Sequence, residues 1–299
     1  MASKKPLNCQ ITNHDLSLKE LLDFGIRFFD LDFNFDSDEN HITTVHGVTN
    51  WYYTYGSMKD AFDEIHSWMK NHPSEIIILY FGDIIANCRP DAVHSLVQLL
   101  EEKFDGENDN IGINDVFRSN NTWPTLEEAK RTNKRIFAFI RIEESNMEID
   151  KLGQKVIGEI GVKMDSPVKE TIPGKTVAVL STYKKMGVGS KCEKIVNHIR
   201  NACLSESRQK TDFNKIALFT AFTKHLDCCL WSIARRCNSR TENILQSCKD
   251  DKAGMWLQAD YPNYPGPSGK TIVETAYDEN QRKSVRRNST QIEAATDLR

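Results

Sequence analysis

Two aspartates and a histidine lie close together near the start of the sequence, in the stretch GIRFFDLDFNFDSDENHITTVHG. Asp30 and Asp32 are separated by one residue at the end of an apolar run, and His46 ends the next β-like run, just before a glycine. Two carboxylates spaced i and i+2 on a strand point to the same side, so their charges repel unless a cation lies between them. Calcium prefers carboxylate oxygens, and an imidazole can move a proton.

Apolar β-like runs and helical patterns alternate along the chain, which is typical of βα units around a parallel sheet. Strands are predicted over residues 26–33, 41–47, 75–83, 135–141, 175–183, 215–223 and 254–260, and helices over residues 56–73, 90–104, 125–134, 190–204 and 271–283. Ser57 is the predicted N-cap of the first of these helices and Pro73 its stop. Thr125 and Glu128 have the spacing of a capping box.

Polar or ionisable residues recur where the predicted strands end: Asp30, Asp32, His46, Asp83, Arg141, Tyr183 and Asp260. A single residue of this kind is more often a helix cap or an ion-pair partner than a ligand. Seven at successive strand ends predict the rim of a (β/α) barrel, where active sites lie. A cation and a guanidinium that neutralise phosphate oxygens, with an imidazole that moves a proton, suit a reaction on a phosphate.

The predicted organisation is one α/β barrel domain over residues 1–283, followed by a polar, disordered tail over residues 284–299. The 299 residues are enough for one large core. A net charge of −3 with no basic stripe gives no reason to expect nucleic acid. No run of 18 apolar residues occurs, so no transmembrane segment is expected. The sequence does not indicate an oligomeric state.

The cysteines allow two interpretations. Six of the eight follow residue 190: Cys192, Cys203, Cys228, Cys229, Cys237 and Cys248. Their spacing fits no zinc motif. They are either buried, reduced thiols in a cytoplasmic protein or a disulfide-linked region in an oxidising compartment. Two sequons, at Asn120 and Asn288, favour a secreted or lumenal protein, although the N-terminal residues show no signal peptide.

The stretches LLDFGIRFFDLDF, TTVHG and AFDEIHSWMKNHPSEIIILYF resemble the X domain of phosphatidylinositol-specific phospholipase C. WPTLEEAKRTNKRIFAFIR and GMWLQADYPN are similar to later strands of that family, and the resemblance extends from about Leu16 to Lys283. It implies a distorted TIM barrel that cleaves the glycerol–phosphate bond of an inositol phospholipid at a membrane surface. One strand at the start of the barrel has no counterpart here.

The resemblance also implies roles for single residues. His46 matches the general acid that protonates the leaving glycerol oxygen. Asp30 and Asp32 match the first motif strand of calcium-dependent members, with Asp83 near a third ligand position. The implied substrate-binding residues are Arg141, which matches a head-group arginine, Tyr183, at the place of a tyrosine that stacks on inositol, and Asp260.

Several family residues are missing from this sequence. No Thr-His-Asn-Ser-like motif with the general base precedes Asp30, and His14 lies in a different context. Gly82 stands where calcium enzymes carry a glutamate, and Ser181 where an aspartate contacts inositol. Either the chain lacks the N-terminal part of a complete enzyme, or it is a non-catalytic relative that binds an inositol-phosphate head group. A glycerophosphodiesterase or sphingomyelinase D-like barrel is a third alternative, because its acidic metal pair is chemically similar.

The aromatic run Trp51-Tyr52-Tyr53-Thr54-Tyr55 follows His46 closely. Tryptophan and tyrosine favour the membrane–water boundary, so this run is a candidate for interfacial contact. The alternative is a loop packed over the barrel mouth.

Overall fold

The computed structural model describes residues 15–48, 51–85, 89–104, 111–113, 124–142, 158–161, 168–172, 175–180, 192–193, 196–197, 217–220, 237–241, 243, 255–258, 262–263, 265 and 268–282. Its helices are α1 (Leu18–Phe24), α2 (Met58–Asn71), α3 (Arg89–Phe104) and α4 (Leu126–Arg131), and residues 237–241 and 272–282 are also helical. Its strands are β1 (Phe28–Asp36), β2 (His41–Val48), β3 (Trp51–Ser57), β4 (Ile77–Ile85), β5 (Gly112–Ile113), β6 (Lys134–Ile142), β7 (Gly158–Gly161), β8 (Val168–Ile172), β9 (Lys175–Leu180), β10 (Ala217–Thr220) and β11 (Met255–Gln258). None of these described helices could cross a membrane.

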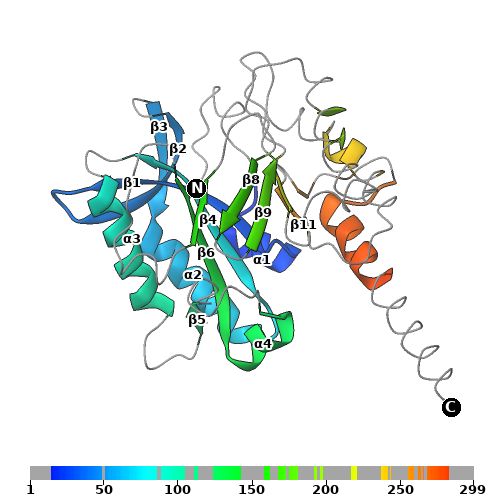
Figure 1. The fold of residues 1–299 in the computed structure, drawn as a ribbon, viewed down its shortest axis with the longest axis horizontal. Coiled ribbons are helices and arrows are strands. Elements are labelled where there is room, and N and C mark those ends of the chain that lie inside the picture. Colours follow the sequence, from blue (N-terminus) through cyan, green and yellow to red (C-terminus); the bar gives the residue numbers. More distant parts are fainter. Residues whose placement is uncertain are drawn as a thin grey trace.

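Two sheets follow each other around a distorted barrel (Figure 1). The first has the order β3-β2-β1-β4-β6-β5, with β7 also paired to β6, and the second has the order β11-β10-β9-β8. β1, β4, β6 and β7 run parallel, as do β9, β10 and β11. β1 lies next to β11, and β7 next to β8, but no hydrogen-bonded ladder joins the described strands at these two junctions. The predicted (β/α) barrel is confirmed, with openings at both junctions.

Local signals start the helices where the sequence predicts. The side chain of Ser57 accepts a hydrogen bond from the Lys59 amide and caps α2, which ends two residues before Pro73. Thr125 and Glu128 form the predicted capping box of α4. The bounds of β4 and β6 agree with their predicted ranges to within two residues.

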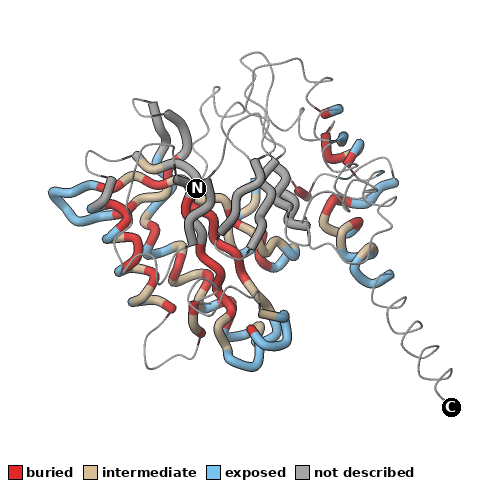
Figure 2. Tube along the Cα trace, in the orientation of Figure 1, coloured by how far each residue is buried: buried red, intermediate tan, exposed pale blue. Residues whose placement is uncertain are grey.

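Alternate residues of β1, β4 and β6 pack against α2 and α3 and form the main core, which appears as the red segments of these elements in Figure 2. The rings of Phe33 and Phe81 meet edge to face with centroids 6.1 Å apart, and Phe62 of α2 lies 6.2 Å from Phe81. Burial of one such side chain stabilises the fold by about 1.5–3 kcal/mol. This packing fixes which residues of each strand face the helices, and therefore which face the barrel interior.

The helix of residues 272–282 packs beside α1. Its first turn has a capping box, in which the Glu274 carboxylate accepts a hydrogen bond from the Thr271 amide at 2.7 Å. Gly25, the C-cap of α1, has φ 108°, and a Cβ at this position would lie 3.0 Å from Cγ1 of Val273. Nearby, the side-chain amide of Asn263 donates to Asp15 at 3.0 Å. Segments far apart in sequence therefore meet beside β1 and β11.

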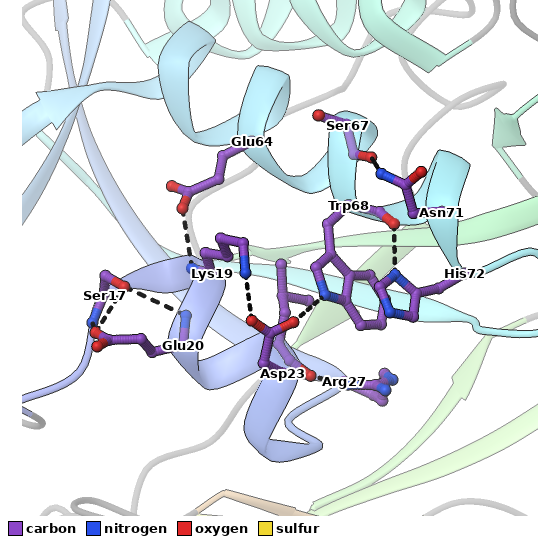
Figure 3. Close-up of polar contacts among 11 residues, drawn as sticks. Ser17, Lys19, Glu20, Asp23, Arg27, Glu64, Ser67, Trp68, Asn71 and His72 are labelled. Carbon is purple, nitrogen blue, oxygen red and sulfur yellow. Dashed lines mark hydrogen bonds and ion pairs between the residues drawn. The ribbon is translucent and has the colours of Figure 1, made fainter.

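Contacts between α1 and α2 surround the N-terminal end of β1 (Figure 3). Asp23 accepts a hydrogen bond from the Trp68 indole at 2.7 Å, and hydrogen bonds from Lys19 and then from Trp68 lower the pKa of Asp23. The Arg27 guanidinium lies 4.5 Å from the centre of the Trp68 ring, on which His72 also stacks at 3.8 Å. Arg27, from the GIR part of the first motif, therefore stabilises the end of the barrel farthest from the candidate site.

Arg135 at the start of β6 links this strand to the C-terminal end of α2 at the same end of the barrel. Its side chain is buried, and its guanidinium donates hydrogen bonds to Asn133 and to the backbone carbonyls of Met69, His72 and Glu75. A cation at the C-terminal end of α2 also complements the helix dipole.

Cys192 and Cys237 form a disulfide, as the second interpretation of the cysteines predicts. The linked segment includes β10, which lies between β9 and β11. The other six cysteines lie outside the described residues.

The expectation of a loop at residues 51–55 is wrong. These residues belong to β3, which pairs antiparallel with β2, and aromatic side chains favour such a paired strand. Tyr55 is 42% exposed. Most of the predicted helix at 190–204 and all of the predicted tail at 284–299 lie outside the described residues.

Candidate active site

Both predicted aspartates of β1 lie on the inner face of the barrel. Phe29, Leu31 and Phe33 pack into the core beneath α2 and α3, so the alternation of a strand directs Asp30 and Asp32 the opposite way. Both are partly buried, and atom Oδ1 of Asp30 is buried. The two carboxylates are therefore expected on one face of β1.

Strand register divides this inner face into levels. The first level, which we call the apolar floor, consists of the register partners Phe28, Ile78 and Phe137. The second level contains Asp30, its partner Tyr80 and the position of Phe139. Such levels are the usual filling of a (β/α) barrel. Polar groups therefore begin at Asp30, directly above the apolar floor.

A β-bulge interrupts the pairing of β1 with β4 at the next level. The register passes from Leu31↔Phe81 to Phe33↔Ile84, so Gly82 and Asp83 together oppose Asp32. Bulges are frequent at barrel rims and beside active sites, where they redirect a side chain. The bulge brings the backbone of Asp83 next to Asp32, although the Asp83 side chain lies outside the described part.

His46 lies one residue from the cross-strand neighbour of Asp32. Asp32 pairs with Val45 of β2, and His46 pairs with Tyr53 of β3. Opposite residues of antiparallel strands are about 4.5–5.5 Å apart. The backbones of the predicted acid and of the aspartate pair are thus close together, while the imidazole is outside the described side chains.

The predicted substrate-binding residues belong to neighbouring strands. Arg141 follows Ile140, the register partner of Phe81, and therefore lies near the level of the bulge. β9 ends at Leu180 and β11 at Gln258. Tyr183 and Asp260, which follow these strands, lie outside the described residues.

The donor chemistry on the inner face fits a hard cation such as calcium. Asp30 and Asp32 offer carboxylate oxygens on one face, and calcium takes oxygen ligands. No group of three His, Cys, Asp or Glu side chains that could hold a metal occurs among the described residues, a set that excludes the side chain of Asp83. The described pair would therefore need at least one further ligand, for which Asp83 has a suitable backbone position.

Tyr80 was not predicted as part of the site. It is 4% exposed, and its ring stacks on Phe28 with centroids 6.1 Å apart at 23°. The run IIILYF is almost entirely apolar, so the sequence does not show which of its residues face the barrel interior. The pairing of β4 with β1 would have been needed to place Tyr80 beside Asp30.

Comparisons with known proteins show which family the chain resembles. The family model for PI-PLC X 1 matches residues 7–229. A curated relative, PI-PLC X domain-containing protein 1 of Arthroderma benhamiae, is 26% identical over 130 residues, which span 43% of this chain and 40% of that protein.

Solved structures of phosphatidylinositol-specific phospholipases C have the same fold. One from Staphylococcus aureus has a TM-score of 0.70 and 18% identity, covering 93% of this chain and 88% of that one. The enzyme from Listeria monocytogenes has a TM-score of 0.61 and 18% identity, with 88% and 83% covered. Because the family model matches about three quarters of the sequence, the chain belongs to the PI-PLC X family.

Proposed function

We propose that the protein is a phosphoric diester hydrolase of the phospholipase C type that acts on phosphatidylinositol-like lipids at a membrane surface. The observation that supports this proposal is the strand register. Asp30 and Asp32 share the inner face above the apolar floor, the backbone of Asp83 lies beside Asp32, and His46 follows Val45, the cross-strand partner of Asp32. Membership of the PI-PLC X family makes a phosphodiester the expected substrate.

In this proposal a hydroxyl of the inositol ring attacks phosphorus, forms the new phosphorus–oxygen bond and loses its proton to a base. His46 is the general acid, which gives a proton to the leaving glycerol oxygen as the bond from that oxygen to phosphorus breaks. Asp30, Asp32 and Asp83 would hold a calcium ion, which would neutralise charge on the phosphate. Arg141 holds the head group through its guanidinium. Tyr183 and Asp260 contact the inositol ring by stacking and by hydrogen bonding, respectively.

The test is release of inositol phosphate from phosphatidylinositol vesicles, with and without a calcium chelator. Removal of a general acid lowers rates by about 10²- to 10⁴-fold, so His46→Ala should lose activity while His94→Ala, at an exposed histidine on α3, should not. Asp32→Asn should lose activity, with Asp38→Asn in the exposed turn after β1 as its control. Absence of chelator-sensitive turnover by the full natural protein would exclude the proposal.

A second candidate is a binding module for an inositol-phosphate head group. The observation in its favour is that Gly82 stands where calcium-dependent members of the family carry a glutamate ligand. This candidate predicts saturable binding of inositol phosphate by calorimetry, retained in His46→Ala and lost in Arg141→Ala. Absence of any heat of binding would exclude the binding module.

We also propose that the protein works in an oxidising compartment, which the Cys192–Cys237 disulfide supports. Thiol labelling of protein freshly extracted from its natural source should leave both cysteines unlabelled until a reductant is added. Labelling of both without reductant would contradict this location.

A further inference from the structure

Tyr80 is an aromatic residue at the level of Asp30 on the inner face. It is the register partner of Asp30, and parallel neighbours lie about 4.8 Å apart with their side chains on the same face. Tyr80 is buried, as are Ile78 and Phe137 of the apolar floor. The tyrosine therefore lies beside Asp30, directly above that floor.

The ring of Tyr80 is held in place. It stacks on Phe28, which lies on β1 two residues before Asp30, with ring centroids 6.1 Å apart and planes 23° apart. Tyrosine has only two side-chain torsions, and packing on both strands restricts them. The same pair of strands thus carries the carboxylate and fixes the ring beside it.

Atom Oδ1 of Asp30 is buried at this level. An aromatic wall that excludes water restricts the orientation of a carboxylate and strengthens its attraction to a cation, because the local dielectric is lower than in water. Groups that orient a ligand from outside the coordination sphere commonly affect metal affinity by about 10- to 100-fold.

We propose that Tyr80 is a positioning residue for Asp30. Its ring, which stacks on Phe28, fixes the orientation of the Asp30 carboxylate for calcium binding. This rests on the proposed function only in the choice of cation. The hydroxyl is not needed for this role, so the planar ring alone should suffice.

The experiment measures calcium binding by calorimetry and, separately, the calcium concentration that half-activates lipid cleavage. Tyr80→Phe keeps the ring and should bind calcium within about threefold of the parent protein. Tyr80→Leu keeps much of the volume but not the ring, and should bind about 10- to 100-fold more weakly. Tyr55→Leu, at an exposed tyrosine on β3, is the matched control and should leave calcium binding unchanged.

A second variant, Phe28→Leu, keeps Tyr80 but removes its stacking partner. The energy of an aromatic pair corresponds to about 2- to 10-fold in affinity, so calcium binding should weaken by that factor. This variant tests the inference even if Tyr80→Leu fails to fold.

The outcomes separate the inference from the proposed function. If the parent binds calcium and Tyr80→Leu weakens binding, the inference holds even when no lipid is cleaved. If Tyr80→Leu lowers only the melting temperature and leaves calcium binding unchanged, the residue is structural and the inference is overturned. A loss in Tyr80→Phe as large as in Tyr80→Leu, or a parent protein that binds no calcium, also overturns it.

Discussion

Replacing Gly25 by alanine adds two separate costs at the contact between α1 and the helix of residues 272–282. An L-residue at φ 108° is strained by roughly 1–2 kcal/mol. The new Cβ would lie 3.0 Å from Cγ1 of Val273, and relief of such overpacking costs about 1–3 kcal/mol more. We expect the free energy of unfolding, measured by urea denaturation, to fall by about 2–5 kcal/mol.

Gly269→Ala is the matched control, because Gly269 has φ 81° and no heavy atom lies within 4 Å of the added Cβ. This variant should show the conformational cost alone, roughly 1–2 kcal/mol. Val273→Ala should restore part of the stability of Gly25→Ala, with a coupling of about 1 kcal/mol or more. Equal losses at Gly25 and Gly269, with no coupling to Val273, would refute the packing of this helix on α1.

Three further predictions concern stability. Replacing Cys192 and Cys237 by serine opens a linked segment with a sequence separation of 45, which should cost about 4 kcal/mol in urea denaturation; a double variant as stable as the oxidised parent would contradict this. Three N-cap residues lower the pKa of the glutamate three positions later below its usual 4.5. The pairs are Ser17 with Glu20, Thr125 with Glu128 and Thr271 with Glu274, and the backbone hydrogen bond contributes more than the side-chain one. Their stabilisation is therefore present above pH 4.5 and is lost as the pH falls through the lowered values; glutamine at all three positions should flatten the acid side of a melting-temperature profile, and an unchanged slope would contradict the assignment. Arg135→Met leaves three backbone carbonyls without their donor and should lower the free energy of unfolding by about 3 kcal/mol. Arg135→Lys should recover part of this loss. A methionine variant as stable as the parent would contradict the stabilising role of these hydrogen bonds.

Much of the barrel could be predicted because its signals are local. Ser57, Thr125 and Glu128 start helices through residues within one turn. The i, i+2 spacing of Asp30 and Asp32 fixes their common face whatever the partner strand is. β3 was not predicted, because no glycine-containing turn separates Val48 from Trp51 to mark a hairpin.

The remaining features depend on pairing between distant segments. The bulge at Gly82 and Asp83 exists only relative to β1, since it is a mismatch in register. The position of Tyr80 beside Asp30 likewise follows from register and not from composition. Eight cysteines allow about a hundred complete pairings, so spacing alone could not single out the bridge at Cys192.

The contact between Asp15 and Asn263 joins residues 248 positions apart. At about 5–20 residues per second, Asn263 is synthesised roughly 12–50 s after Asp15. Hairpins and helices form within microseconds, so β1, β2, β3 and α2 can assemble on the ribosome long before the final helix exists. During that interval the part of β1 that later lies next to β11 is not yet covered, and chaperone capture or aggregation should compete with folding at this step.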